Sequence, residues 1–87
     1  MFAIGDLVYV DDLRIRDDLN NHMGRVCCES RPDRVGIQML VGHERVWARR
    51  QNLTPITNFS TLTHEPYSTM PVADLYLARQ VLLEADT

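Results

Sequence analysis

The stretch Gly36-Ile37-Gln38-Met39-Leu40-Val41-Gly42-His43-Glu44-Arg45-Val46-Trp47-Ala48 predicts a β-hairpin. Gly42-His43 suits a two-residue loop of type II′, whose twist matches two antiparallel strands. That loop places Met39 opposite Val46 and Gln38 opposite Trp47. Because side chains alternate across a strand, one face is apolar and the other mixed. The apolar face holds Ile37, Met39, Val46 and Ala48, and the mixed face holds Gln38, Leu40, Arg45 and Trp47. A one-residue slip would destroy this agreement.

Composition predicts one small soluble domain. The chain has 87 residues, is 45% hydrophobic and carries a formal net charge of −3. This acidic balance argues against a protein that coats nucleic acid with a generally basic surface. No apolar run approaches the ~20 residues of a membrane span. The first residues lack the features of a secretory signal, so the expected location is cytoplasmic.

The rest of the chain completes a small β domain. Further short strands are expected at 5–10, 23–30 and 53–56, with a helical turn at 49–52. Five short strands in a strongly bent sheet favour closure into a barrel, which hides the edges of the sheet. In the connection over 11–22, Leu13, Ile15 or Leu19 is expected to hold a charged, solvated loop on the barrel. Its paired aspartates, Asp11/Asp12 and Asp17/Asp18, could also hold a hard cation, although a calcium-loop spacing is missing.

Four short motifs support the same fold. They are Gly5-Asp6-x-Val8, Leu19-Asn20-Asn21-x-x-Gly24-x-Val26, Gly42-x-Glu44-Arg45-Val46 and Asn52-Leu53-x-Pro55. Together they resemble SH3-like small β-barrels, particularly the bacterial and KOW-type versions, over the first two thirds of the chain. The resemblance implies a five-stranded barrel over residues 1–57. Asn21 stands where the family usually has Gly, and Asn tolerates the left-handed backbone that such a turn requires.

A linker and a C-terminal helix follow the barrel. Residues 58–68 predict an extended linker that lays Phe59, Leu62 and Tyr67 on the barrel. Residues 69–87 predict a helix whose first residue is Pro71, with Thr69 or Met70 as its cap, and which continues through Val72–Ala85. The helix has two apolar stripes, so it is expected to pack on the barrel and on a partner, most simply in a homodimer. The linker residues could instead cover the second stripe. The association helix is assigned Val72, Leu75, Tyr76, Arg79, Leu82 and Leu83.

The expected function is binding without catalysis. No cofactor motif, metal-spaced cluster or nucleophile turn is present, and the adjacent Cys27 and Cys28 lack metal or redox spacing. In a strand, one of these cysteines would be buried and the other nearer solvent. The expected binding face holds Arg45, Trp47, Arg49, Arg50, Gln38 and Leu40. Arginines beside an aromatic suit a protein interface or a single nucleic-acid strand. Alternatively, Trp47 lies beneath the helix or the Asp-rich loop, with the arginines paired to Asp17 or Asp18.

The resemblance leaves the ligand open. Small barrels of this kind often serve as accessory proteins of mobile genetic elements, such as phages or gene cassettes. KOW-type barrels bind nucleic acid, which here would use Arg25 together with the arginines and the tryptophan of the expected face. Some plasmid-borne reductases share the barrel, but their cofactor-binding strand motif is missing here.

Overall fold

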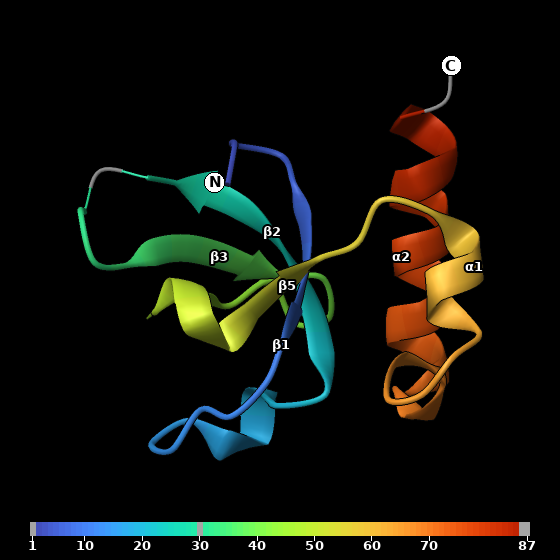
Figure 1. Ribbon diagram of the computed structural model, residues 1–87, viewed down its shortest axis with the longest axis horizontal. Helices are drawn as coiled ribbons and strands as arrows, with labels where there is room; N and C mark the ends of the chain where they lie inside the picture. Colours follow the sequence, from blue (N-terminus) through green and yellow to red (C-terminus); the bar gives the residue numbers. More distant parts are fainter. Residues whose placement is uncertain (1, 30, 86–87) are drawn as a thin grey trace.

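A five-stranded antiparallel sheet and a helical layer make up the chain in the computed structural model, which describes residues 2–29 and 31–85 (Figure 1). The strands are β1 (Leu7–Val10), β2 (His22–Cys28), β3 (Val35–Met39), β4 (Arg45–Ala48) and β5 (Leu53–Pro55). The helices are α1 (Phe59–Leu62) and α2 (Val72–Ala85), with short 3-10 turns η1 (Asp17–Leu19), η2 (Arg50–Asn52) and η3 (Tyr67–Thr69). The expected strand end at Ser30 and the domain ends at residues 1, 86 and 87 lie outside the described residues. Within the described ranges, neither helix has both the length and the apolar character needed to cross a membrane.

The strands form one sheet in the order β4-β3-β2-β1-β5. Each neighbouring pair is antiparallel. No pairing joins β4 to β5 in the described part of the chain, so the sheet is open, and the expected barrel closure is not confirmed. The turn η2 separates these two strands, and β5 is short. Its Pro55 has no N–H to donate, which suits the edge position expected for this strand.

The central hairpin has the predicted faces but not the predicted turn. Ile37 pairs with Val46, and the Met39 amide donates to the Glu44 carbonyl at 2.8 Å. The loop therefore holds four residues, 40–43, and the predicted two-residue loop is wrong. Both Gly42 (φ 83°) and His43 (φ 58°) are left-handed, whereas a type II′ turn needs this only at its first central residue.

The correction shifts the pairing by two residues, and a shift of two leaves every side chain on its original face. Ile37, Met39 and Ala48 are accordingly buried, and Val46 packs against the same core. The two faces of the hairpin could be predicted because they depend on the period of the strand and not on the length of the loop.

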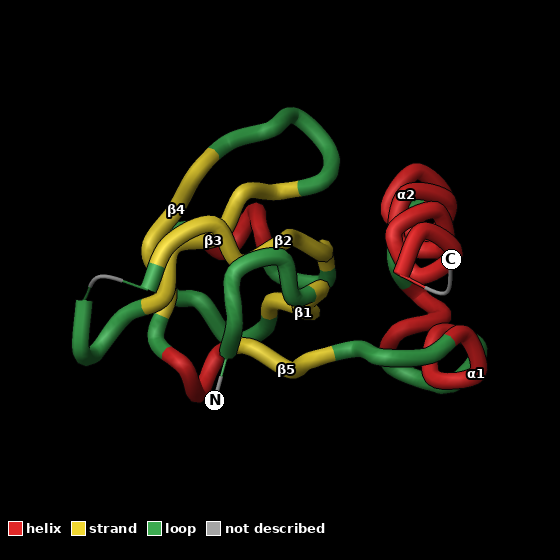
Figure 2. Tube along the Cα trace, turned by 90° about the horizontal axis from the view of Figure 1, so that it is seen from above, coloured by secondary structure: helices red, strands yellow, loops and turns green. Residues whose placement is uncertain are grey.

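The sheet has a separate apolar core on each of its faces. The inner core holds Phe2, Val8, Val10, Leu19, Val26, Val35, Ile37, Met39, Ala48 and Leu53. The helix-side core holds Leu7, Tyr9, Met23, Ile56, Leu62, Met70, Ala78 and Leu82. Figure 2 shows the helical layer along one side of the sheet, with β4 at the far side. Since β1 supplies alternate residues to the two cores, all four of its residues are buried, as in a strand covered on both faces.

The expected connection over 11–22 is partly held to the sheet. Leu19 is buried in the inner core and Leu13 packs against it, whereas Ile15 is 92% exposed. Two of the three expected anchors therefore hold this loop, and the third faces solvent.

The linker prediction is wrong in conformation and right in its contacts. Residues 58–68 contain α1 and enter η3 instead of being extended. The Asn58 side chain caps α1 by accepting the Thr61 amide at 3.2 Å, an N-cap arrangement. Phe59, Leu62 and Tyr67 pack on the helix-side core, as expected. The Tyr67 ring meets Tyr9 edge-on, with 4.9 Å between ring centroids.

A buried carboxylate fastens α2 to the sheet. Asp74, in the first turn of α2, is 1% exposed. Its Oδ1 accepts the Met23 backbone amide at 3.1 Å, and its Oδ2 lies 2.9 Å from His22 Nδ1. Asn21 makes a second link, because its Nδ2 donates to the Thr69 carbonyl at 3.2 Å and its Oδ1 accepts the Tyr9 hydroxyl at 2.9 Å.

The backbone of Asn21 adopts the left-handed conformation (φ 66°) that was expected at this position. Burial, and next the charge of Asp11, raises the pKa of Tyr9. The Tyr9 hydroxyl therefore keeps the proton that it donates to Asn21.

Removing the Asp74 carboxylate should loosen the helical layer. In Asp74→Ala, the buried Met23 amide loses its acceptor, and we expect a loss of about 1–3 kcal/mol in the free energy of unfolding, measured by urea denaturation. Asp74→Asn removes the same charge but keeps an oxygen for Met23, so its loss should be smaller. Exchange of the Met23 amide should accelerate only in the alanine variant. Equal losses, with unchanged exchange, would show that these hydrogen bonds do not anchor α2.

Gly24 allows β2 and β3 to approach each other closely. A Cβ at this position would lie 2.3 Å from Ile37 Cγ2 and 3.0 Å from the Gln38 carbonyl oxygen. A backbone atom cannot yield as a side chain can, so the close approach of the two strands requires glycine at position 24.

We expect Gly24→Ala to lower the free energy of unfolding by about 1–3 kcal/mol through overpacking. Gly36→Ala is the matched comparison, since its closest contact would be 3.0 Å, to Cys28 Cβ. Its loss, measured in the same thermal melts, should be smaller. A Gly24→Ala melt within about 0.5 kcal/mol of the parent would contradict the steric argument.

Candidate functional site

A groove of about 650 Å³ lies between the loop after β1 and the segment from β4 to η2. We call it the Trp47 groove. Its lining consists of Asp12, Leu13, Arg14, Ile15, Arg16, Arg34, Val46, Trp47, Arg49, Gln51 and Asn52. The side-chain Nδ2 of Asn52 donates to the backbone carbonyls of Asp11 and Asp12 at 3.0 and 3.1 Å. These two hydrogen bonds hold the loop against η2. The groove therefore has one wall from the loop and one from the β4–η2 segment.

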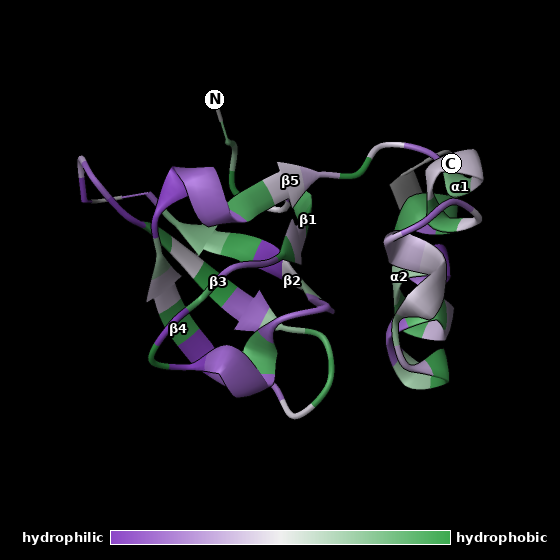
Figure 3. Ribbon diagram, turned by 60° about the horizontal axis from the view of Figure 1, so that its bottom comes forward, coloured by the Kyte–Doolittle hydropathy of each residue, from purple (hydrophilic) through white to green (hydrophobic). Residues whose placement is uncertain are grey.

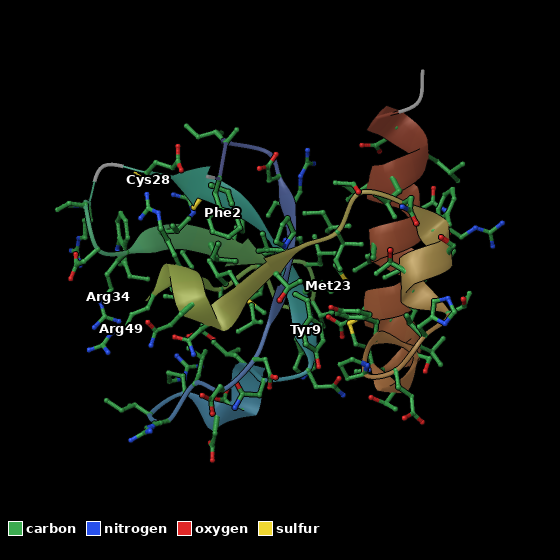
Figure 4. The ribbon with its side chains drawn as sticks, viewed as in Figure 1. Phe2, Tyr9, Met23, Cys28, Arg34 and Arg49 are labelled. Atoms are coloured by element: carbon green, nitrogen blue, oxygen red, sulfur yellow. The ribbon has the colours of Figure 1, made fainter. Side chains whose placement is uncertain are left out.

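The groove concentrates positive charge in an acidic chain. Four arginines and one aspartate line it, although the whole chain carries a net charge of −3. Of these arginines, Arg14, Arg34 and Arg49 make no ion pair or side-chain hydrogen bond with the described residues. Figure 4 labels Arg34 and Arg49, which point away from the sheet at the end remote from the helices. Three guanidinium groups thus remain available to an anionic ligand.

Trp47 is held by its neighbours and is half-buried. The guanidinium carbon of Arg31 lies 4.3 Å from the centroid of its ring, a cation–π contact. Gly36 on β3 is the cross-strand partner of Trp47, and the far edge of the indole lies over this glycine. The ring lies beside the loop that carries the aspartates and does not belong to the helix-side core. Of the alternatives for Trp47, cover by α2 is therefore wrong, and the ring shares the lining of the groove with the loop.

The residues of the expected binding face are divided between two places. Trp47 and Arg49 line the Trp47 groove. Gln38 and Leu40 instead line a second hollow of about 340 Å³, together with Arg25 and residues of α2. Arg50 is turned to the other side, where it donates to the Pro32 carbonyl at 3.2 Å and lies 3.9 Å from Glu29. Arg45 is exposed and lines neither hollow.

The aspartate loop is tied to the central hairpin through Arg16. Its guanidinium pairs with Asp18 at 3.0 Å and with Glu44, whose Oε1 lies 2.9 Å from Nη2. The expected pairing of Arg45, Arg49 or Arg50 with Asp17 or Asp18 is not observed. Hydrogen bonding to Arg16 lowers the pKa of Asp18 and of Glu44. In turn, the hydrogen bond to Glu44, and to a smaller extent that to Asp18, raises the pKa of Arg16. The loop is therefore held in place by charge as well as by Leu13.

The histidine of β2 and the two cysteines lie outside the Trp47 groove. In the described ranges, no group of three or more His, Cys, Asp or Glu residues is placed to hold a metal ion. His22 lies in β2 and not in a loop, and it contacts Asp74. The Thr69 hydroxyl donates to the Pro66 carbonyl at 2.6 Å. Cys27 and Cys28 are both half-buried at an irregularity in the β2–β3 pairing, and no disulfide joins them. The expectation that one of the two cysteines is buried is therefore wrong.

The assigned association helix presents only some of its residues. Val72, Tyr76 and Leu83 are 82%, 62% and 43% exposed. Arg79 is also exposed, Leu75 is half-buried, and Leu82 is buried against the sheet. Phe59 and Tyr67 pack on the helix-side core, but the exposed stripe remains uncovered. Figure 3 shows hydrophobic residues recurring along α2, in contrast to the hydrophilic 3-10 turns of the sheet layer.

Four important residues were not identified from the sequence. Arg14, Arg31 and Arg34 come from two connections, and only the fold brings them to Trp47. Asp74 could have been found, because it shares a helix face with Ala78 and Leu82 at a spacing of four. A short acid on an apolar stripe indicates a buried carboxylate with a partner.

Comparison with known proteins gives no relative for this chain. No protein-family model, curated protein or solved structure matches it. The site must therefore be interpreted from its own chemistry.

The ion pairs of Arg16 predict a specific pH dependence. A carboxylate whose pKa is lowered in the folded state stabilises that state above its unfolded pKa, here 3.8 for Asp18 and 4.5 for Glu44. This contribution is lost as the pH falls through the lowered values. We expect the melting temperature of Arg16→Gln to fall below that of the parent near pH 7, by a small amount because the groups are exposed. The difference should shrink as the pH falls below the unfolded pKa values and vanish once both carboxylates are protonated in the folded state.

Arg14→Gln is the matched control, since Arg14 has no carboxylate partner in the described residues. Its melting temperature should differ from the parent by the same amount at every pH. Carboxyl titration by NMR should show the pKa values of Asp18 and Glu44 rising in Arg16→Gln. Unchanged values would disprove the assigned ion pairs.

Proposed function

We propose that this chain is a non-catalytic binding module, and that its ligand is an acidic, extended segment of another protein held in the Trp47 groove. The observation that carries this proposal is the convergence of Arg14, Arg34 and Arg49 around Trp47 in an otherwise acidic chain. Trp and Arg are the residues most enriched at energetically important positions of protein interfaces. Guanidinium groups bind carboxylates through paired hydrogen bonds, which favours a ligand with Asp or Glu side chains.

The groove also offers apolar surface. Ile15 is 92% exposed on the loop, and Leu13 and Val46 lie partly buried within the lining. A ligand that alternates acidic and apolar side chains would match both parts of this surface. An extended peptide has such an alternation, because its side chains project to opposite sides with a period of two.

The fold assignment that accompanies this function is an open variant of the SH3-like barrel. The strand order β4-β3-β2-β1-β5, a 3-10 turn directly before β5 and a left-handed Asn21 support it. These features agree with the motifs that suggested the family. In this variant the aspartate loop and η2 frame the groove where β4 and β5 do not pair.

Single-stranded nucleic acid is the second candidate, because the same arginines could contact phosphates. One observation favours the peptide. The Trp47 ring already carries the Arg31 guanidinium at 4.3 Å, where a base would need to stack.

NMR titration of the full chain tests the proposal with two defined probes. One is a capped ten-residue peptide of alternating Glu and Val, and the other is a ten-nucleotide oligothymidylate. We expect the peptide to shift the Trp47 indole resonance and the amides of the groove. In Arg34→Gln/Arg49→Gln, its affinity should fall roughly tenfold or more, equivalent to about 1.4 kcal/mol.

Arg45→Gln is the matched control, because it removes the same charge from β4 outside the groove and should leave the affinity unchanged. Binding of oligothymidylate alone, weakening steeply with salt, would establish the nucleic-acid alternative instead. If neither probe shifts the groove resonances, or if the double variant binds as well as the parent, the Trp47 groove is not the ligand site.

A further inference from the structure

The outward face of α2 carries a short stripe that its own chain leaves uncovered. Val72, Tyr76 and Leu83 are exposed, and Arg79 lies between the last two. At 3.6 residues per turn, these four positions fall within an arc of about 60°. Their spacings of four, three and four are those of the contact positions in a coiled coil. In the described residues, the side chains of Tyr76 and Arg79 have no hydrogen-bond or ionic partner.

We propose that this stripe, Val72, Tyr76, Arg79 and Leu83, binds the same stripe of a second copy, with the two α2 helices antiparallel about a two-fold axis. The stripe is symmetric about its midpoint, between Leu77 and Ala78. When one helix is reversed against the other about this point, Val72 meets Leu83 and Tyr76 meets Arg79. The two-fold axis repeats each of these contacts, as an isologous interface requires.

The paired side chains are chemically complementary in this arrangement. The outer pairs bury aliphatic groups that are now in water. The central pairs place a guanidinium beside a tyrosine ring of the partner, a cation–π contact. In a parallel arrangement Arg79 would meet Arg79 and Tyr76 would meet Tyr76, which sets like charges together. The charge pattern therefore selects the antiparallel pairing and favours a second copy over an arbitrary apolar partner.

The proposed interface is small and remote from the groove. Val72 and Leu83 are separated by about 16 Å along the helix. A stripe of this length buries less surface area than a standard protein interface. We therefore expect a reversible dimer with a dissociation constant on the order of micromolar. The helical layer lies at the opposite end of the molecule from Arg34 and Arg49 (Figure 4), so each copy keeps its Trp47 groove open.

Sedimentation equilibrium of the full chain and three variants tests the proposal. Val72→Glu and Leu83→Lys each remove an outer apolar contact while suiting the helix dipole, so neither should weaken α2 itself. We expect each single variant to weaken the dimer at least tenfold. The double variant Val72→Glu/Leu83→Lys should bind more tightly than either single variant, because each Glu then faces a Lys of the partner, although a surface ion pair is too weak to restore the parent affinity.

The control is Ile15→Lys, which replaces an exposed apolar residue far from α2 and should leave the mass unchanged. Circular dichroism should show the same helix content in all variants. A full-length chain that stays monomeric at hundreds of micromolar would overturn the proposal. Single variants that dimerise like the parent would also overturn it, and a double variant that binds no more tightly than the single variants would overturn the antiparallel register.

Discussion

Burial of the first strand on both faces is the constraint on which the rest of this structure depends. Val8 and Val10 belong to the inner core, whereas Leu7 and Tyr9 need cover from outside the sheet. The C-terminal third supplies this cover by folding back as a helical layer. Because apolar contact alone is not directional, polar links fix the position of that layer. Asp74 and Asn21 provide these links where β2 begins.

Two surfaces do not contribute to either apolar core: the arginine-rich side of the Trp47 groove and the outward face of α2. The Trp47 groove lies beside β4, at an unpaired edge of the sheet, and gathers arginines from separate connections. The outward face of α2 is open because Ala78 and Leu82 already cover the sheet. One surface is cationic and hollow, and the other is mainly apolar and convex. The two proposed interactions, an acidic peptide in the Trp47 groove and a second copy at α2, therefore use different chemistry.

The parts of the fold that depend on local periodicity were predictable. The alternation in 36–48 correctly assigned the faces of the hairpin. The loop, however, has four residues instead of the predicted two, so each strand residue pairs with a different partner. The helix over Val72–Ala85 was placed correctly by Pro71 and the apolar pattern. The short α1 was missed, since four residues cannot show a helical period and Asn58 is its main local signal.

The groove could not be predicted for a different reason. Trp47 and Arg49, two residues of the expected binding face, line the groove, and Arg14 and Arg34 join them there from separate connections. Long-range placement of this kind leaves no pattern in the chain. The buried Asp74 was the exception, because its place on an apolar helix stripe was visible.

One further consequence follows from the position of Trp47. It is the sole tryptophan of the chain, and it contacts both a guanidinium and the groove. Ultraviolet emission excited at the indole absorption edge therefore arises from this place alone. The Arg31 guanidinium beside the ring affects the wavelength and the quantum yield of that emission. The protein thus contains its own optical reporter of whatever enters beside β4, with no label attached.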